Sequence, residues 1–116
     1  MNIKSIGMLV LILLLSCKAV AGQVASGKIL QMMVNTQHST DMLFVRISGN
    51  LTGTPSCNIN GAWQFVLPLD NELQKDTITS FLLSAYMSGK NIRLDGNNLC
   101  DTFSSIETLT RVEFLE

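Results

Sequence analysis

Residues 75–95 read KDTITSFLLSAYMSGKNIRLD, and the fold prediction depends on the change of pattern inside them. Apolar residues recur first at spacings of three and four, which predicts a helix over 75–88. Gly89 follows directly and suits the left-handed conformation that ends many helices. A strand is expected immediately afterwards, over 91–95. The apolar stripe expected to face the core comprises Ile78, Phe81, Leu82, Ala85 and Tyr86.

Further strands are expected on both sides of this helix, because apolar residues there alternate with a period of two. Three precede the helix, over residues 28–35, 42–48 and 62–67, and one closes the chain over 108–115. Residues 23–26 carry no such pattern and are expected to be a frayed terminal segment. The side chains assigned to the core on the second and third strands are Leu43, Val45, Ile47, Trp63, Phe65 and Leu67.

The predicted order is therefore β-β-β-α-β-β, in a mainly β domain with one helix. This is the order of elements in a five-stranded OB-fold barrel. The alternative is an open α+β sheet with the helix packed on one face. Cys57 and Cys100 fall in two polar loops, 49–61 and 96–105. A disulfide between two loops is sterically easy, so we predict that Cys57 and Cys100 are bonded.

The N-terminus has the pattern of an export signal. An apolar run over residues 6–15 is shorter than the roughly 20 residues that span a membrane. Ala-Val-Ala then precedes Gly22, so residues 1–21 are predicted to be removed and 22–116 to form a single domain. We expect an exported protein, periplasmic or secreted, since disulfides persist in oxidising compartments. The alternative is a lipoprotein anchored at Cys17.

The charge balance argues against nucleic-acid binding. The chain has 8 basic and 9 acidic residues, and Lys4 and Lys18 leave with the signal. The acidic remainder has no basic stripe to neutralise phosphates. No second long apolar run is present, so no integral membrane span is expected after signal removal.

Motifs for metal, cofactor and catalytic chemistry are missing from the sequence. One histidine and two distant cysteines lack the spacing of a metal site, and we expect no cofactor. His38, Ser39 and Asp41 lie on one short loop, whereas a catalytic triad converges from fixed positions on a scaffold. No sequence motif of a common hydrolase or phosphate-binding loop occurs. We therefore predict that the protein is not an enzyme.

Four segments carry a resemblance to a known group of proteins. They are Pro-Ser-Cys at 55–57, Trp-Gln-Phe at 63–65, FLLSAYMSGKNI at 81–92, and Gly96 with Cys100. The stretch looks like small exported bacterial proteins that are similar to the B subunit of subtilase cytotoxin and to pertussis-like toxin B subunits. The match covers roughly half of the mature chain, and its motifs are mainly structural.

The resemblance implies an OB-fold, a ring-shaped homopentamer and binding of host cell-surface glycans, often sialylated. It also implies a separate catalytic A subunit as a partner. This chain is shorter than those B subunits, and none of their sugar-contacting residues can be placed on it one by one.

Candidate ligand-binding residues come from the loop and strand patterns. Gln37, His38 and Ser39 lie in a polar loop, where they would hydrogen-bond to the hydroxyls or the carboxylate of a sugar. Phe44 and Arg46 share the less buried face of the second strand, which would serve as a binding face or an oligomer contact. We expect an exported glycan-binding protein. The alternative is a monomeric periplasmic protein that binds a small ligand or inhibits an enzyme.

Overall fold

A computed structural model describes residues 21–70 and 72–116 of the chain. The predicted export signal lies outside these residues except for Ala21, and so does Cys17. Within the described ranges, no helix has the length and the apolar composition that a membrane crossing requires.

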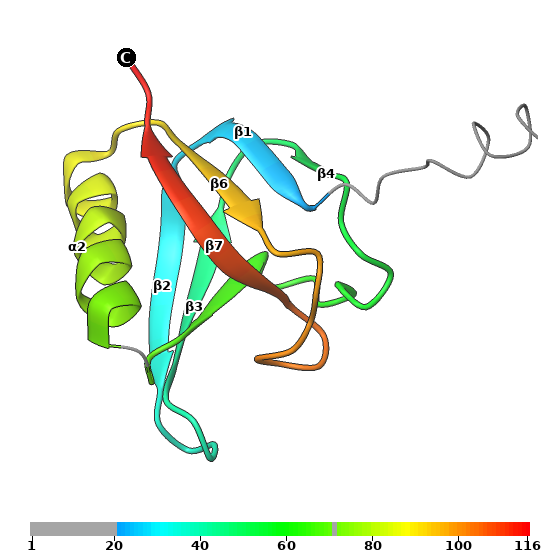
Figure 1. The fold of residues 1–116 in the computed structure, drawn as a ribbon. Helices are drawn as coiled ribbons and strands as arrows, with labels where there is room; N and C mark the ends of the chain where they lie inside the picture. The colour runs from blue at the N-terminus through cyan, green and yellow to red at the C-terminus, as the bar shows by residue number, and fades with distance from the viewer. Residues whose placement is uncertain (1–20, 71) are drawn as a thin grey trace, which may run out of the picture.

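The described chain is mainly β with one helix, as the sequence predicts (Figure 1). Helix α2 is present where the change in apolar spacing predicts it, although it begins three residues earlier, at Glu72, and two additional strands make it follow the fifth strand instead of the third. The elements are β1 (Gln23–Gly27), β2 (Ile29–Asn35), β3 (Met42–Ile47), β4 (Leu51–Thr52), β5 (Phe65–Pro68), α2 (Glu72–Ser88), β6 (Ile92–Gly96) and β7 (Glu107–Phe114).

The prediction of a five-stranded closed barrel is wrong. The described strands form a seven-stranded mixed sheet in the order β2-β3-β5-β7-β6-β1-β4, which is nearer to the open-sheet alternative. One additional strand, β1, replaces the expected frayed segment and pairs with β6 and β4. The other, β4, falls inside a predicted loop. Both strands contain too few apolar residues for a period-two pattern to be recognised in the sequence. They are held as strands by hydrogen bonds to their sheet neighbours.

A sharp bend between β1 and β2 turns the sheet back over itself. Only Lys28 separates these strands, yet β1 pairs with β6 and β2 pairs with β3. The bend is fixed by Ser48, whose N–H donates to the Lys28 carbonyl and whose Oγ accepts from the Lys28 N–H, both at 2.9 Å. The backbone segments at Gly27 and Ser48 lie so close together that a Cβ at position 27 would collide with the carbonyl oxygen of Ser48.

The main core lies between the two halves of the bent sheet and the helix. In Figure 1, β6 and β7 lie in front of β2 and β3, and α2 runs along one side. Five of the six predicted core residues on the second and third strands are confirmed, and Trp63 is the exception. The buried members are Val24, Ile29, Leu43, Val45, Ile47, Phe65, Leu67, Leu82, Ala85, Ile92, Leu94 and Leu109.

Helix α2 buries a narrower stripe than the sequence predicts. Leu82 and Ala85 are fully buried and Ile78 is partly buried. Phe81 and Tyr86 are 45% and 44% exposed, so their assignment to the core is wrong. The helix contacts the sheet through β2 and β7, and the Phe81 ring packs against that of Phe114 on β7, with centroids 5.7 Å apart. The helix is therefore apolar on more than the face that it buries.

The predicted helix stop at Gly89 is confirmed. Its φ is 65°, and its N–H donates to the Ala85 carbonyl at 3.0 Å. A Cβ at Gly89 would meet no atom within 4 Å, so the cost of a substitution there comes from the positive φ and not from a clash.

We expect Gly89→Ala to lower the free energy of unfolding by about 1 kcal/mol, because alanine resists the left-handed conformation. Gly89→Asn is the matched control, since asparagine tolerates that conformation better and should cost less. Urea denaturation of both variants measures the difference. Equal losses for alanine and asparagine would contradict the conformational explanation.

Candidate ligand-binding site

A second apolar cluster lies on the face of β3 and β5 opposite the main core. Phe44 is its centre, with its ring 5.3 Å from that of Phe103 and 5.9 Å from that of Trp63. Phe44 is only 3% exposed, so the prediction that it lies on a less buried face is wrong. Two loops fold over that face of the strand and cover it. We call this group the aromatic cluster; its buried members are Met42, Phe44, Val66 and Ile106, and Trp63 and Phe103 pack against them.

The two loops that supply Trp63 and Phe103 are joined to each other. The predicted disulfide between Cys57 and Cys100 is present, with a Cα–Cα distance of 6.2 Å. The Asn60 N–H also donates to the Ser105 carbonyl at 3.1 Å. A covalent bond and a backbone hydrogen bond therefore hold the cover of the aromatic cluster in place.

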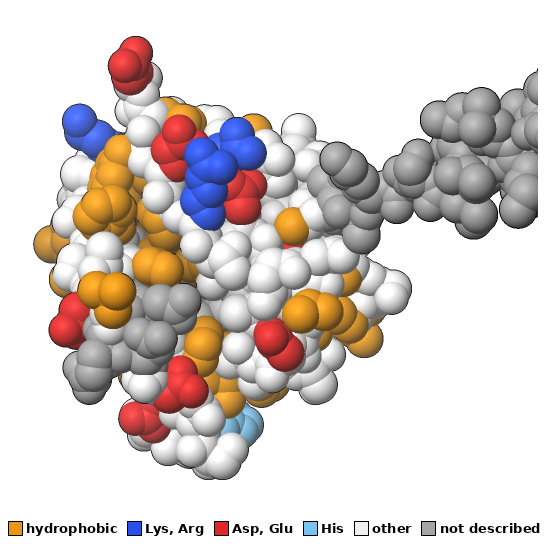
Figure 2. Space-filling model, viewed as in Figure 1, with side chains coloured by type: hydrophobic (Ala, Val, Ile, Leu, Met, Phe, Trp, Pro, Cys, Tyr) orange, Lys and Arg blue, Asp and Glu red, His pale blue; other side chains and the backbone are white. Residues whose placement is uncertain are grey.

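The loop between β2 and β3 reaches the same cluster through His38. Its ring meets Phe103 edge-on, with centroids 5.6 Å apart. Gln37 and Ser39 are exposed on either side of it. Figure 2 shows the only histidine of the chain, in pale blue, beside hydrophobic side chains at one end of the molecule. His38 and Phe44 are therefore linked through the ring of Phe103.

A hollow of about 180 Å³ opens beside the aromatic cluster. It lies where the β2–β3 loop, the end of β5 and the loop after β6 come together. Its lining carries two carboxylates and two hydroxyls and no basic side chain. The lining residues are Thr40, Pro68, Asp70, Asp101 and Thr102.

Asp101 is held in its charged form at this hollow. The Thr108 hydroxyl donates to its Oδ1 at 2.6 Å, and Asn97 Nδ2 donates to the same oxygen at 3.4 Å. The Thr108 hydrogen bond is the main reason that the pKa of Asp101 lies below its usual value. Slight burial acts in the opposite direction, and the Asn97 bond adds to the lowering. Asp101 is thus a fixed, anionic hydrogen-bond acceptor.

Arg46 is exposed on β3, on the same face as Phe44 and two residues beyond it. The polar and aromatic site residues missed by sequence reasoning are Thr40, Asp70, Asp101, Thr102 and Phe103. Phe103 carried one usable signal, since it is a single aromatic residue in a polar loop that a cysteine anchors. The threonine and aspartate residues of the hollow give no such signal, because polar residues of this kind are common in loops and only the fold brings these together.

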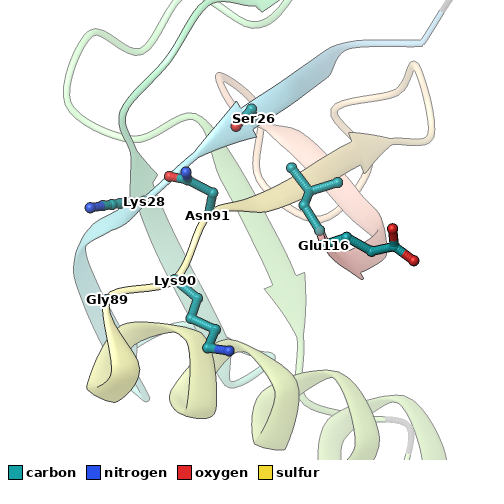
Figure 3. Close-up of a pocket in the computed structure, with 7 residues that line it drawn as sticks. Ser26, Lys28, Gly89, Lys90, Asn91 and Glu116 are labelled. Atoms are coloured by element: carbon teal, nitrogen blue, oxygen red, sulfur yellow. The ribbon is translucent and has the colours of Figure 1, made fainter.

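A larger hollow, of about 360 Å³, lies between the β1–β2 bend and the turn after α2. Its charged side chains do not converge on one point. In Figure 3 the amino groups of Lys28 and Lys90 point in different directions, and the Glu116 carboxylate is turned away from both. This hollow therefore offers no set of groups that would hold one ligand.

Among the residues that the structure describes, no three His, Cys, Asp or Glu side chains are grouped in a way that could hold a metal ion. No protein-family model matches the chain. No curated protein is significantly similar to it in sequence.

Proposed function

We propose that this chain is an exported, non-enzymatic binding protein of the toxin B-subunit kind that recognises cell-surface glycans. The observation that carries the proposal is the meeting of the β2–β3 loop and the β6–β7 loop around the hollow that contains Asp101. OB-fold domains bind oligosaccharides with the corresponding pair of loops.

The strand pairing supports the relation to those domains. β1 and β2 are nearly continuous and pair with β6 and β3 respectively, while β5 and β7 pair in parallel. A long first strand shared between two halves of a sheet is consistent with a bent, OB-like arrangement, although the sheet has seven strands.

The chemistry of the site fits a sugar with several hydroxyl groups. His38 and the half-buried Phe103 offer aromatic surface for the apolar side of a sugar ring. Asp101 accepts hydrogen bonds, and the hydroxyls of Thr40 and Thr102 both donate and accept them. Because Asp70 and Asp101 are both acidic, the hollow favours neutral sugars over anionic ones. Exposed Arg46 lies four residues along β3 from Met42, the sheet partner of Pro68 at the hollow, so it would attract an acidic sugar only away from the hollow.

Exposed apolar side chains support self-association into the proposed homopentamer. On α2, Leu73, Leu83 and Met87 are 77%, 52% and 75% exposed. Figure 2 shows a hydrophobic band over the side of the molecule that carries α2. A helix that is apolar outside its buried stripe is typical of one that packs against a further partner. A ring of such subunits would carry the catalytic A subunit that the resemblance implies.

The test is a glycan array probed with the oxidised, exported protein, followed by affinity measurements on variants. Removing one good polar contact costs about 1–2 kcal/mol, which is roughly tenfold in affinity. We expect Asp101→Asn and Phe103→Ala each to weaken binding to the best glycan about tenfold or more. Arg111→Ala is the control, since Arg111 is exposed on β7 and pairs only with Asp95 and Glu113 among the described residues.

Two outcomes would count against the proposal. One is an array without any bound glycan. The other is binding that all three variants weaken equally, because a specific site is not sensitive to Arg111. Light scattering behind size exclusion gives the mass of the assembly. The mass of a monomer would contradict the homopentamer. A monomer without glycan affinity would favour the alternative of a protein that binds a small ligand or inhibits an enzyme.

A further inference from the structure

Glu107, the first residue of β7, is a fully buried carboxylate with neutral partners only. Its Oε2 accepts hydrogen bonds from the N–H groups of Gly22 at 3.0 Å and Asn98 at 2.8 Å. Its Oε1 is buried too and has no hydrogen-bond partner among the described residues. None of the ion pairs found in the described part of the chain includes Glu107. A buried carboxylate without a counter-charge is strongly unfavourable.

The Glu107 carboxyl group fits its site because two neighbouring positions are glycine. A Cβ at Gly22 would collide with Oε1, and a Cβ at Gly96 would collide with the carboxyl group as a whole. The unpartnered oxygen therefore faces Gly22.

The backbone at Gly22 is held in a fixed place. The Gly96 N–H donates to the Gly22 carbonyl at 2.9 Å. The next residue, Gln23, pairs with Asp95 in the sheet. The nitrogen atom of Gly22 is thus fixed against Glu107 by strand pairing and not by a flexible side chain.

The Ala-Val-Ala pattern predicts export cleavage directly before this nitrogen, between Ala21 and Gly22. Hydrolysis of that bond consumes one water molecule, leaves a carboxylate on Ala21 and leaves an amine on Gly22. An α-amine has an ordinary pKa near 8, so at neutral pH it takes up a proton. One amide N–H beside Glu107 then becomes three N–H donors with a positive charge.

We propose that the mature chain begins at Gly22 and that its α-ammonium group is the charge partner of the buried Glu107 carboxylate. The ammonium group supplies the missing counter-charge and a donor for Oε1. A cut one residue earlier or later moves the terminal nitrogen by about 3.8 Å, which is outside hydrogen-bond reach.

The pair would also connect leader removal to the loops of the candidate site. The Glu107 N–H donates to Asn58 Oδ1 at 3.2 Å, next to Cys57. The Asn98 N–H that binds Glu107 is in the loop that contains Cys100, and the φ of Asn98 is 66°. This inference requires export but not glycan recognition, so it fails or stands separately from the binding proposal.

The test uses the full precursor, exported and processed by the cell. Intact mass of the purified protein is expected to match residues 22–116 with one disulfide. A second precursor carries one glycine inserted between Ala21 and Gly22, so that processing leaves the ammonium one residue too far from Glu107. We expect the insertion to lower the midpoint of thermal unfolding by about 4–8 °C or more.

The variant Glu107→Gln tests whether Glu107 is the charge partner of the Gly22 α-ammonium group. In that background the same insertion should have almost no effect, because an uncharged amide gains little from an ammonium group. Glu113→Gln, which removes a partly exposed carboxylate from the same strand, should leave the effect of the insertion unchanged. Equal losses with and without Glu107, or a mature chain that starts elsewhere, would overturn the proposal.

A second readout does not depend on the stability of the Glu107 variant. The rate at which a reagent acylates the α-amine at neutral pH is followed by mass spectrometry. In the native mature protein it should be at least tenfold slower than in the glycine-inserted protein, because a protonated, paired amine is a poor nucleophile. Equal rates in the two proteins would also overturn the proposal.

Discussion

Replacing Cys57 and Cys100 together by alanine is expected to lower the free energy of unfolding by about 4 kcal/mol. The bonded cysteines are 43 residues apart in sequence, and the bond restricts the unfolded chain by closing that long loop. A small domain has a total stability of about 5–15 kcal/mol, so the loss is a large share of it. The double replacement avoids leaving a single reactive thiol in the loops.

Urea denaturation of the mature double variant measures this loss, and the reduced wild-type protein serves as the matched comparison. Both should be destabilised by similar amounts if the bond itself matters more than the two side chains. A loss below about 1 kcal/mol would contradict the prediction, and would mean that the loops around the aromatic cluster restrict the unfolded chain without the bond.

Phe65→Ala is expected to cost about 3–5 kcal/mol, because Phe65 is fully buried in the main core and its removal leaves a cavity. Trp63→Ala, two residues earlier, is expected to cost only about 1–2 kcal/mol. Trp63 is half-buried and covers the aromatic cluster on the opposite face. Thermal and urea denaturation of the two variants separate the roles of the two rings.

The order of these two losses is the decisive result. If Trp63→Ala were the more damaging change, the aromatic cluster and not the main core would dominate stability. Glycan affinity gives an independent check, since Phe65 is fully buried in the main core and Trp63 packs against Phe44 in the aromatic cluster.

The contrast between Trp63 and Phe65 also explains where prediction from the sequence stops. Period-two alternation placed both rings on one face, but β5 begins only at Phe65. Within the strand the alternation holds, and Phe65 and Leu67 enter the core. Before it, the chain follows the loop, and Trp63 joins the opposite cluster. Alternation predicts faces only where the backbone is already extended in a sheet.

The candidate site was less predictable than the core for a related reason. Periodicity in the sequence identifies core residues because the residues on the inner face of a strand or helix are mostly apolar. The hollow at Asp101 depends on two loops that are distant in sequence and meet through strand pairing and the disulfide. The polar character of its loop is enough to predict His38 as a candidate. Its contact with Phe103 depends on how the two loops pack together, which sequence periodicity does not determine.

The pairing of β1 with β6 has a consequence for the order of folding. Gln23, near the start of the described fold, has Asp95 as its sheet partner. A chain that leaves a ribosome or a translocation channel N-terminus first cannot complete this half of the sheet until almost all of it has emerged. The first strand must therefore wait for nearly the last one, so the β1–β6 half of the sheet closes after the β2–β3–β5 strands have had time to pair.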